Sequence, residues 1–138
     1  MKHHIEILAI VVIAYVLGFL CGAAWAEQNP ATMDRLLDAI EQVESGGNPR
    51  AVGDNGKAVG AYQIWKICVD DCNRIVGRKR WTLEDRWDRV KSREMCRTYL
   101  THYGGTTEEM ARKWNGGPRG HTKAATLPYW AKIKKELK

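Results

Sequence analysis

The apolar residues of the chain recur at helical spacing in several short segments. The first segment lies between residues 32 and 45 and carries five such positions, Met33, Leu36, Leu37, Ile40 and Val43. Asn29-Pro30 precedes it as a cap and a first helical residue, and Gly46-Gly47 follows it as a stop. The pattern therefore predicts a helix with one buried face that ends at about Ser45.

A β-hairpin is predicted next, between residues 51 and 60. Asn55-Gly56 lies there between short runs of small and branched residues, and this dipeptide is the strongest short-range signal for a hairpin. Asp54 directly precedes the dipeptide, and Asp is a common residue in turns.

Four further helical patterns follow the hairpin. The first runs from about residue 65 to 76, and the second from a sequence like a capping box at residues 82–85 to Tyr103, with a break near Asp88 or Ser92. Thr106 and Glu109 open the third, which ends at residues 115–118, and the lysine-rich fourth begins at about Leu127. One hairpin among several helices predicts an α+β fold that is predominantly helical.

Residues 1–26 have a different composition from the rest of the chain. Lys2 lies in a short basic start, residues 7–26 carry no charge, and Ala24-Trp25-Ala26 resembles a signal-peptidase site just before Glu27. The uncharged run is longer than the ~7–15 residues of a usual signal peptide and close to the ~20 that span a bilayer. A cleaved signal peptide and a retained transmembrane anchor both remain open. In either case we expect residues 27–138 to form one domain outside the cytoplasm, periplasmic or secreted.

The net charge of the chain is +6, and residues 27–138 keep all of it, because the preceding segment contributes only Lys2 and Glu6. A basic surface speeds encounters with anionic polymers such as nucleic acid, lipid headgroups or bacterial cell wall. Export argues against nucleic acid as the partner. Simple solubility is the alternative explanation of the charge.

Glu44 is the residue whose position most needs explaining. Ile40 and Leu37 lie four and seven residues before it, so Glu44 falls on the apolar face of its helix. Desolvation there, together with the helix C-terminus, raises the pKa of a carboxyl group. A carboxyl that stays protonated near neutral pH is the proton donor that a glycosidic oxygen needs. The alternative is a Glu at a helix end whose head turns to solvent.

Three short motifs then occur in order: ESGGN at residues 44–48, GAYQI at residues 60–64 and ARKWNGG at residues 111–117. Together they resemble the lytic transglycosylase family of the lysozyme superfamily, the soluble-transglycosylase-like domain of bacteria and phages. The resemblance covers about residues 34–118. It implies a lysozyme-like fold in which Glu44 ends the first helix and faces a sugar-binding cleft.

The same resemblance implies roles for five more residues. Gln63 would hydrogen-bond substrate, Asn115 would position sugar and backbone near the acid, and Ser45 would orient the carboxylate or the substrate. Two positions depart from the family pattern. Tyr62 stands where the family usually has Met, and Trp114 where it usually has Tyr. Both are expected to line the cleft and contact substrate.

The family implies that Glu44 protonates the oxygen between N-acetylmuramic acid and N-acetylglucosamine in peptidoglycan. It would then remove a proton from the muramic C6 hydroxyl, which leaves a 1,6-anhydro end. A hydrolytic lysozyme or phage endolysin usually needs a second carboxylate, for which Asp54 is the candidate. Lytic transglycosylase is thus the leading interpretation and muramidase the alternative, while a non-catalytic wall-binding module of the same fold is the third.

Three cysteines follow the first 26 residues, and outside the cytoplasm cysteines usually pair. Cys68 and Cys72 lie one helical turn apart, so either could form a disulfide with Cys96. Their spacing from the histidines matches no familiar metal site, and we expect neither a metal nor a cofactor. Most of the tryptophans are expected in the core. The protein is expected to be a monomer, attached to the membrane only if the first segment is retained.

Overall fold

The computed structural model describes residues 29–138, and the predicted export segment lies outside them. Contacts divide the chain into residues 1–32 and residues 33–138, and the second unit carries the features described below. Its helices are α2 (Pro30–Ser45, which begins in the first unit), α3 (Lys66–Ile75), α4 (Arg89–Tyr103), α5 (Thr107–Gly116) and α6 (Leu127–Glu136). None of the helices in the described part is long and apolar enough to cross a membrane.

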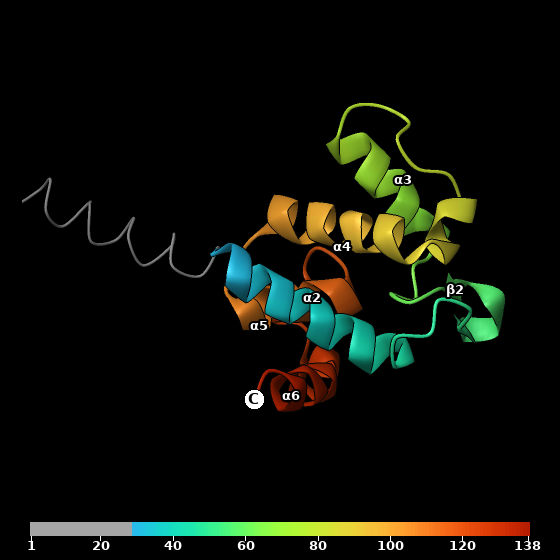
Figure 1. The fold of residues 1–138 in the computed structure, drawn as a ribbon. Coiled ribbons are helices and arrows are strands. Elements are labelled where there is room, and N and C mark those ends of the chain that lie inside the picture. The colour runs from blue at the N-terminus through green and yellow to red at the C-terminus, as the bar shows by residue number, and fades with distance from the viewer. Residues whose placement is uncertain (1–28) are drawn as a thin grey trace, which may run out of the picture. The chain divides into compact units, whose positions relative to one another are not determined.

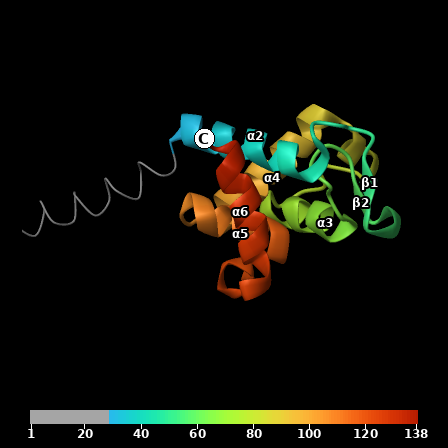
Figure 2. The same ribbon diagram turned by 90° about the horizontal axis from the view of Figure 1, so that it is seen from below.

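Helix α4 lies in the middle of this unit and packs against α3 and against α5, while α5 also packs against α6 (Figures 1 and 2). The buried core between these helices takes Leu36, Leu37 and Ile40 from α2, Leu100 from α4 and Ile133 from α6, each of them fully buried. The apolar face predicted for residues 32–45 therefore does face the core. The predominantly helical α+β class is confirmed.

The small sheet consists of β1 (Val52–Gly53) and β2 (Ala58–Val59), which pair antiparallel with Val52 opposite Val59. The predicted hairpin exists, but Asn-Gly does not form a two-residue turn. The connection is a longer loop that contains a short 3₁₀ segment, Asp54–Gly56, in which Asp54 and Asn55 both have positive φ values, 47° and 55°. Two consecutive left-handed non-glycine residues are unusual, and the loop places the exposed Asp54 on the wall of a pocket described below.

The helix ends follow the sequence signals with one exception. Asn29 Oδ1 accepts from the Ala31 amide at 3.0 Å, and the Thr106–Glu109 capping box is complete. The capping box expected at Thr82 does not start the long helix, because Thr82 donates to the Asp85 carboxylate and caps nothing itself. Residues 84–87 form a 3₁₀ turn instead, and α4 begins after Asp88, whose carboxylate accepts from the amides of Val90 and Lys91.

Candidate active site

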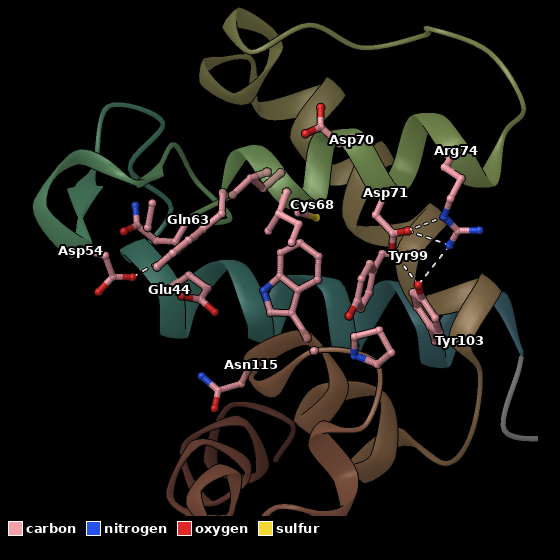
Figure 3. A pocket seen from close by; sticks show the side chains of 17 residues that line it. Glu44, Asp54, Gln63, Cys68, Asp70, Asp71, Arg74, Tyr99, Tyr103 and Asn115 are labelled. Atoms are coloured by element: carbon pink, nitrogen blue, oxygen red, sulfur yellow. Dashed lines mark hydrogen bonds and ion pairs between the residues drawn. The ribbon is translucent and has the colours of Figure 1, made fainter.

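A pocket of about 840 Å³ opens between the end of α2, the hairpin, α3, α4 and the end of α5. Figure 3 shows Glu44, Asp54 and Gln63 at one end of this pocket and Asp71, Arg74 and Tyr103 at the other. Residues far apart in the sequence therefore line one cavity, whose volume lies in the range of ligand-binding pockets. This cavity is called the cleft below.

Glu44 reaches the cleft from the last turn of α2, on the same side as the fully buried Leu37 and Ile40. Burial raises the pKa of its carboxyl from 4.5 to about 7, and the nearby charge of Asp54 acts in the same direction. Hydrogen bonds from Tyr129 and Trp114 oppose this rise. At neutral pH a large fraction of the Glu44 side chains is therefore protonated and can donate a proton to a group bound in the cleft.

Tyr129 is the partner that holds the Glu44 carboxyl. Its hydroxyl donates to Glu44 Oε1 at 2.8 Å, across 85 positions of sequence. Tyr129 lies near the start of α6 and is buried, and burial beside Glu44 raises the pKa of its hydroxyl well above the usual value. Sequence reasoning missed this residue. The sequence indicates only that the last helix has an apolar face. No neighbouring residue indicates that Tyr129 on this face contacts a carboxyl group.

Asp54 lines the same cleft from the hairpin loop. The indole Nε1 of Trp65 donates to Asp54 Oδ2 at 3.2 Å, so the carboxylate is held in place (Figure 3). Its left-handed backbone belongs to the sparsely populated conformations that cluster at functional sites. A carboxylate held in this way can stabilise a positive charge or direct a water molecule next to Glu44.

Gln63, Trp114 and Asn115 all line the cleft with Glu44, so the structure brings together three of the residues named from the family motifs. Gln63 has a φ of 50°, its Nε2 donates to the carbonyl of Gly60 at 3.0 Å, and its Oε1 lies only 2.4 Å from where a Cβ on Gly53 would be. The glycine in β1 therefore makes room for the Gln63 side chain. Asn115 is exposed in the cleft and free to meet a ligand.

Tyr62 requires a correction, because it does not line the cleft, and the role expected for Ser45 stays a prediction. Tyr62 is fully buried, and its hydroxyl donates to Glu41 Oε2 at 3.3 Å and accepts from Arg93 at 3.0 Å. It therefore joins α2 to α4 behind the cleft, where no substrate can reach it. Ser45 Oγ donates to the carbonyl of Ala61 at 2.7 Å, so it ties the end of α2 to the segment that carries Gln63.

Trp65 is a tryptophan that lies outside the core. Most tryptophans were expected in the core, and Trp81 does lie there, but Trp65 is 40% exposed and forms part of the cleft wall. The sequence offered a faint signal for this position, since Trp65 follows the GAYQI motif directly. An exposed indole at the edge of a cleft is suited to stacking on the face of a sugar ring.

The three cysteines within residues 29–138 are free thiols in the structure. Cys68 and Cys72 are neighbours on α3, and Cys72 Sγ donates to the carbonyl of Met95 on α4 at 3.4 Å. Cys96 is buried on α4, and burial raises the pKa of its thiol. The disulfide from Cys68 or Cys72 to Cys96 is therefore not formed here and stays a prediction. Across the described residues, no group of three His, Cys, Asp or Glu side chains is arranged to hold a metal ion.

The chain is similar to one protein family and to two lysozymes. The transglycosylase SLT domain family matches residues 22–137. Invertebrate-type lysozyme 6 of Caenorhabditis elegans is 33% identical over 130 residues, covering 83% of this chain and 94% of that protein. Invertebrate-type lysozyme 3 of the same organism is 33% identical over 115 residues, covering 71% and 81%.

One solved structure is similar in fold and sequence, a crystal structure of Aeromonas hydrophila PliI in complex with Meretrix lusoria lysozyme. One chain of it matches with a TM-score of 0.62 and 26% identity, over 73% of this chain and 87% of that chain. The family match spans most of the sequence, and it includes Glu44 and all the residues that line the cleft. The chain therefore belongs to the transglycosylase SLT domain family and has a lysozyme-like fold.

Proposed function

We propose that the chain is a glycosidase that cleaves the β-1,4 bond between N-acetylmuramic acid and N-acetylglucosamine in peptidoglycan, with Glu44 as the general acid. The observation that carries this proposal is a half-buried carboxyl whose pKa desolvation raises to about 7, on the wall of the cleft. The names of the family and of both lysozyme relatives support the substrate class.

The first step follows from the position of Glu44. Its proton passes to the glycosidic oxygen as the bond from that oxygen to C1 breaks, and positive charge develops on the muramic ring. On the hydrolytic route considered below, the negative charge of Asp54 on the same cleft would stabilise that ring. Trp65 and Trp114 provide apolar surfaces for sugar faces, and Gln63 and Asn115 provide amide groups for hydroxyl and N-acetyl groups.

A lytic transglycosylase would complete the reaction without water. The Glu44 carboxylate would take the proton of the muramic C6 hydroxyl, whose oxygen closes on C1 to give a 1,6-anhydro end. The family match supports this route, and so does the fact that a single carboxyl is sufficient for both steps.

Hydrolysis is the second candidate, and the position of Asp54 favours it. A muramidase uses a second carboxylate to stabilise the cation, to form a covalent intermediate or to activate water. Asp54 lies on the cleft with Glu44 and is held there by Trp65 in a strained backbone conformation. The two lysozyme relatives point the same way. We therefore propose hydrolysis as the preferred route, on the position of Asp54 and the names of these relatives.

Glu44→Gln tests the proposal as a whole, because Gln keeps the shape of the side chain but has no acidic proton. We expect the rate of peptidoglycan solubilisation by purified residues 27–138 to fall by roughly 10²–10⁴. If the folded variant keeps more than a tenth of the wild-type activity, Glu44 is not the general acid. A wild-type protein that binds peptidoglycan without cleaving it would favour the wall-binding module instead.

Mass spectrometry of the products, together with Asp54→Asn, separates the two routes. Hydrolysis predicts reducing muramic ends and a loss of at least tenfold in Asp54→Asn. Transglycosylation predicts 1,6-anhydro ends and an Asp54→Asn variant that retains most of its activity. Anhydro products from the wild-type protein would contradict the preference for hydrolysis and leave the proposed glycosidase intact.

A further inference from the structure

A second pocket adjoins the cleft on the other side of Trp65. Its volume is about 590 Å³, and it shares Trp65, Ile67 and Asp70 with the cleft. Trp65 and Ile67 are 40% and 73% exposed, so the wall between the two pockets is accessible from solvent. A polymer lying in the cleft would thus have this second pocket next to it, within reach of its side groups.

The charges that line the second pocket are mostly positive. Lys57, Lys66 and Arg86 line it, and the only carboxylate among its lining residues is Asp70, which pairs with Lys66 at 2.5 Å. Lys57 Nζ lies 5.6 Å from the centroid of the Trp65 ring. Neither Lys57 nor Arg86 forms an ion pair with another of residues 29–138. Their charges therefore remain available to an anionic ligand.

Arg86 is fixed in this pocket rather than extended into solvent. Its Nε donates to the carbonyl of Leu83 at 2.9 Å, and its Nη1 donates to the carbonyls of Lys57 and Ile64 at 3.4 and 3.3 Å. The backbone around it is equally constrained, since a Cβ on Gly60 would lie 1.9 Å from the Arg86 carbonyl oxygen. The guanidinium is thus already in place before a ligand arrives, which lowers the entropic cost of binding.

Helix α3 adds to the positive potential. It begins at Lys66, beside the pocket, and its N-cap residue Trp65 makes no side-chain capping bond. The first amides of a helix and the positive end of its dipole favour an anion. Together with Lys57, Lys66 and Arg86, this helix end makes a site suited to carboxylate groups.

We propose that the second pocket binds the carboxylates of the peptide stem that is attached to muramic acid, so that the preferred substrate is peptide-bearing glycan. The inference rests on the proposed function, because it takes the polymer in the cleft to be peptidoglycan. In the intact polymer the lactyl carboxyl of muramic acid is taken up in the amide bond to the stem peptide, so the free carboxylates are those of the stem. A glycan strand in the cleft therefore carries them to the positively charged pocket beside Trp65.

The test compares two substrates and two double variants. The substrates are glycan strands from sacculi that contain no teichoic acid, either with their peptide stems or after an amidase has removed them. Removal leaves a single lactyl carboxylate on each muramic residue, so the comparison measures the effect of the further carboxylates of the stem. The variants are Lys57→Gln with Lys66→Gln, and, as the matched control, Lys134→Gln with Lys135→Gln on the exposed face of α6. Both double variants lower the net charge by the same amount, so general attraction to the polymer falls equally in each.

We expect wild-type protein to cleave peptide-bearing strands with a kcat/KM roughly tenfold higher than stripped strands, the size of one charge-assisted hydrogen bond. The Lys57/Lys66 variant should lose this preference through a higher KM, and the Lys134/Lys135 control should keep it. Equal wild-type rates on both substrates would overturn the inference, as would a preference that survives in the Lys57/Lys66 variant. Either result leaves the proposed glycosidase standing.

Calorimetry with the Glu44→Gln protein provides a readout that does not depend on cleavage. A disaccharide-peptide should bind at least several-fold more tightly than the same disaccharide without its peptide, and the Lys57/Lys66 change should remove the difference. If the wild-type protein cleaves neither substrate but this binding difference is present, the proposed function fails and the pocket assignment holds. If the disaccharide-peptide binds no better than the disaccharide, the pocket assignment fails.

Discussion

The surroundings of Glu44 favour the neutral form of its carboxyl group. Its pKa rises from 4.5 to about 7, mainly because α2 places it on a buried face. The folded protein therefore holds a proton that the unfolded chain releases, and folding is penalised wherever the unfolded carboxyl is ionised. The general acid of the proposed reaction thus costs stability at neutral pH, which is a common feature of functional sites.

This cost predicts how Glu44→Gln changes stability with pH. Below pH 4.5 the wild-type carboxyl is protonated in both states, so the variant gains nothing from the change in charge. As pH rises from 4.5 to 7 the wild-type protein loses stability relative to the uncharged Gln variant, up to about 3 kcal/mol above pH 7. Urea unfolding of both proteins at pH 4 and pH 8 measures the difference. An equal difference at the two pH values would show that Glu44 is not buried as described.

The hydroxyl of Tyr129 predicts a change in the pH profile. Only the protonated acid starts the reaction, so activity of the wild-type protein should fall as pH rises through about 7. Tyr129→Phe removes a donor that lowers the pKa of Glu44, so this fall should move to higher pH. The measurement is kcat/KM against pH from 5 to 9.

Tyr62→Phe is the matched control for this change. It removes another buried hydroxyl, which bonds to Glu41 on the same helix as Glu44 but behind the cleft. It should lower stability without moving the alkaline limb of the profile. A limb that shifts in the Tyr62 variant, or stays in place in the Tyr129 variant, would contradict the assigned role of Tyr129.

At the scale of elements, the loop and strand segment from Val52 to Ile64 positions the polar groups of the cleft. Asp54 and Gln63 both have positive φ values there, and Gly60 lies against the Arg86 carbonyl oxygen with a φ of 80°. Close contact between this segment and residues 84–87 thus sets the position of two cleft residues and of Arg86. The backbone of this segment is strained, and the strained conformation fixes the arrangement of these side chains.

Gly60→Ala should therefore be strongly destabilising. The added Cβ would meet the Arg86 carbonyl oxygen at 1.9 Å, and the left-handed backbone adds a further ~1–2 kcal/mol. Gly56→Ala is the matched control, with a φ of 87° but no atom within 4 Å of the added Cβ. Thermal unfolding should show a much larger drop in midpoint for Gly60→Ala than for Gly56→Ala. Similar drops would indicate that only the left-handed conformation matters at Gly60.

For the whole molecule, the cleft exists only where five separate stretches of chain meet. Glu44 comes from α2, Asp54 and Gln63 from the hairpin region, Asp71 and Arg74 from α3, Tyr103 from α4, and Trp114 and Asn115 from α5. Tyr129 on α6 then completes the contact to Glu44. Any change that shifts α6 relative to α2 should alter the pKa of the acid as well as stability.

The export segment predicted for residues 1–26 would decide where the protein is found. We expect the protein in the cell envelope or medium, because the basic start precedes the uncharged run of residues 7–26. N-terminal sequencing of that material should give Glu27 for a cleaved signal peptide or Met1 for a retained anchor. Full-length protein confined to the cytoplasmic fraction would contradict the prediction of export.

Local sequence was sufficient to predict most of the helices and the place of Glu44 at the end of the first one. Helical spacing, caps such as Asn29 and the Thr106–Glu109 box, and glycine stops act over a few residues, so they define α2, α3, α5 and α6 without tertiary information. The same spacing placed Glu44 on a buried face. The family motifs added Gln63, Trp114 and Asn115, which the cleft does bring together.

Only the tertiary structure decided which of the remaining side chains face the cleft. Tyr62 lies one residue before Gln63 yet points into the core, because the backbone at Gln63 turns into the left-handed region. Tyr129 meets Glu44 across 85 positions of sequence, and Trp65 joins the cleft to a positively charged pocket that includes Arg86. Such contacts depend on the packing of distant helices, and no pattern of a few neighbouring residues contains that information.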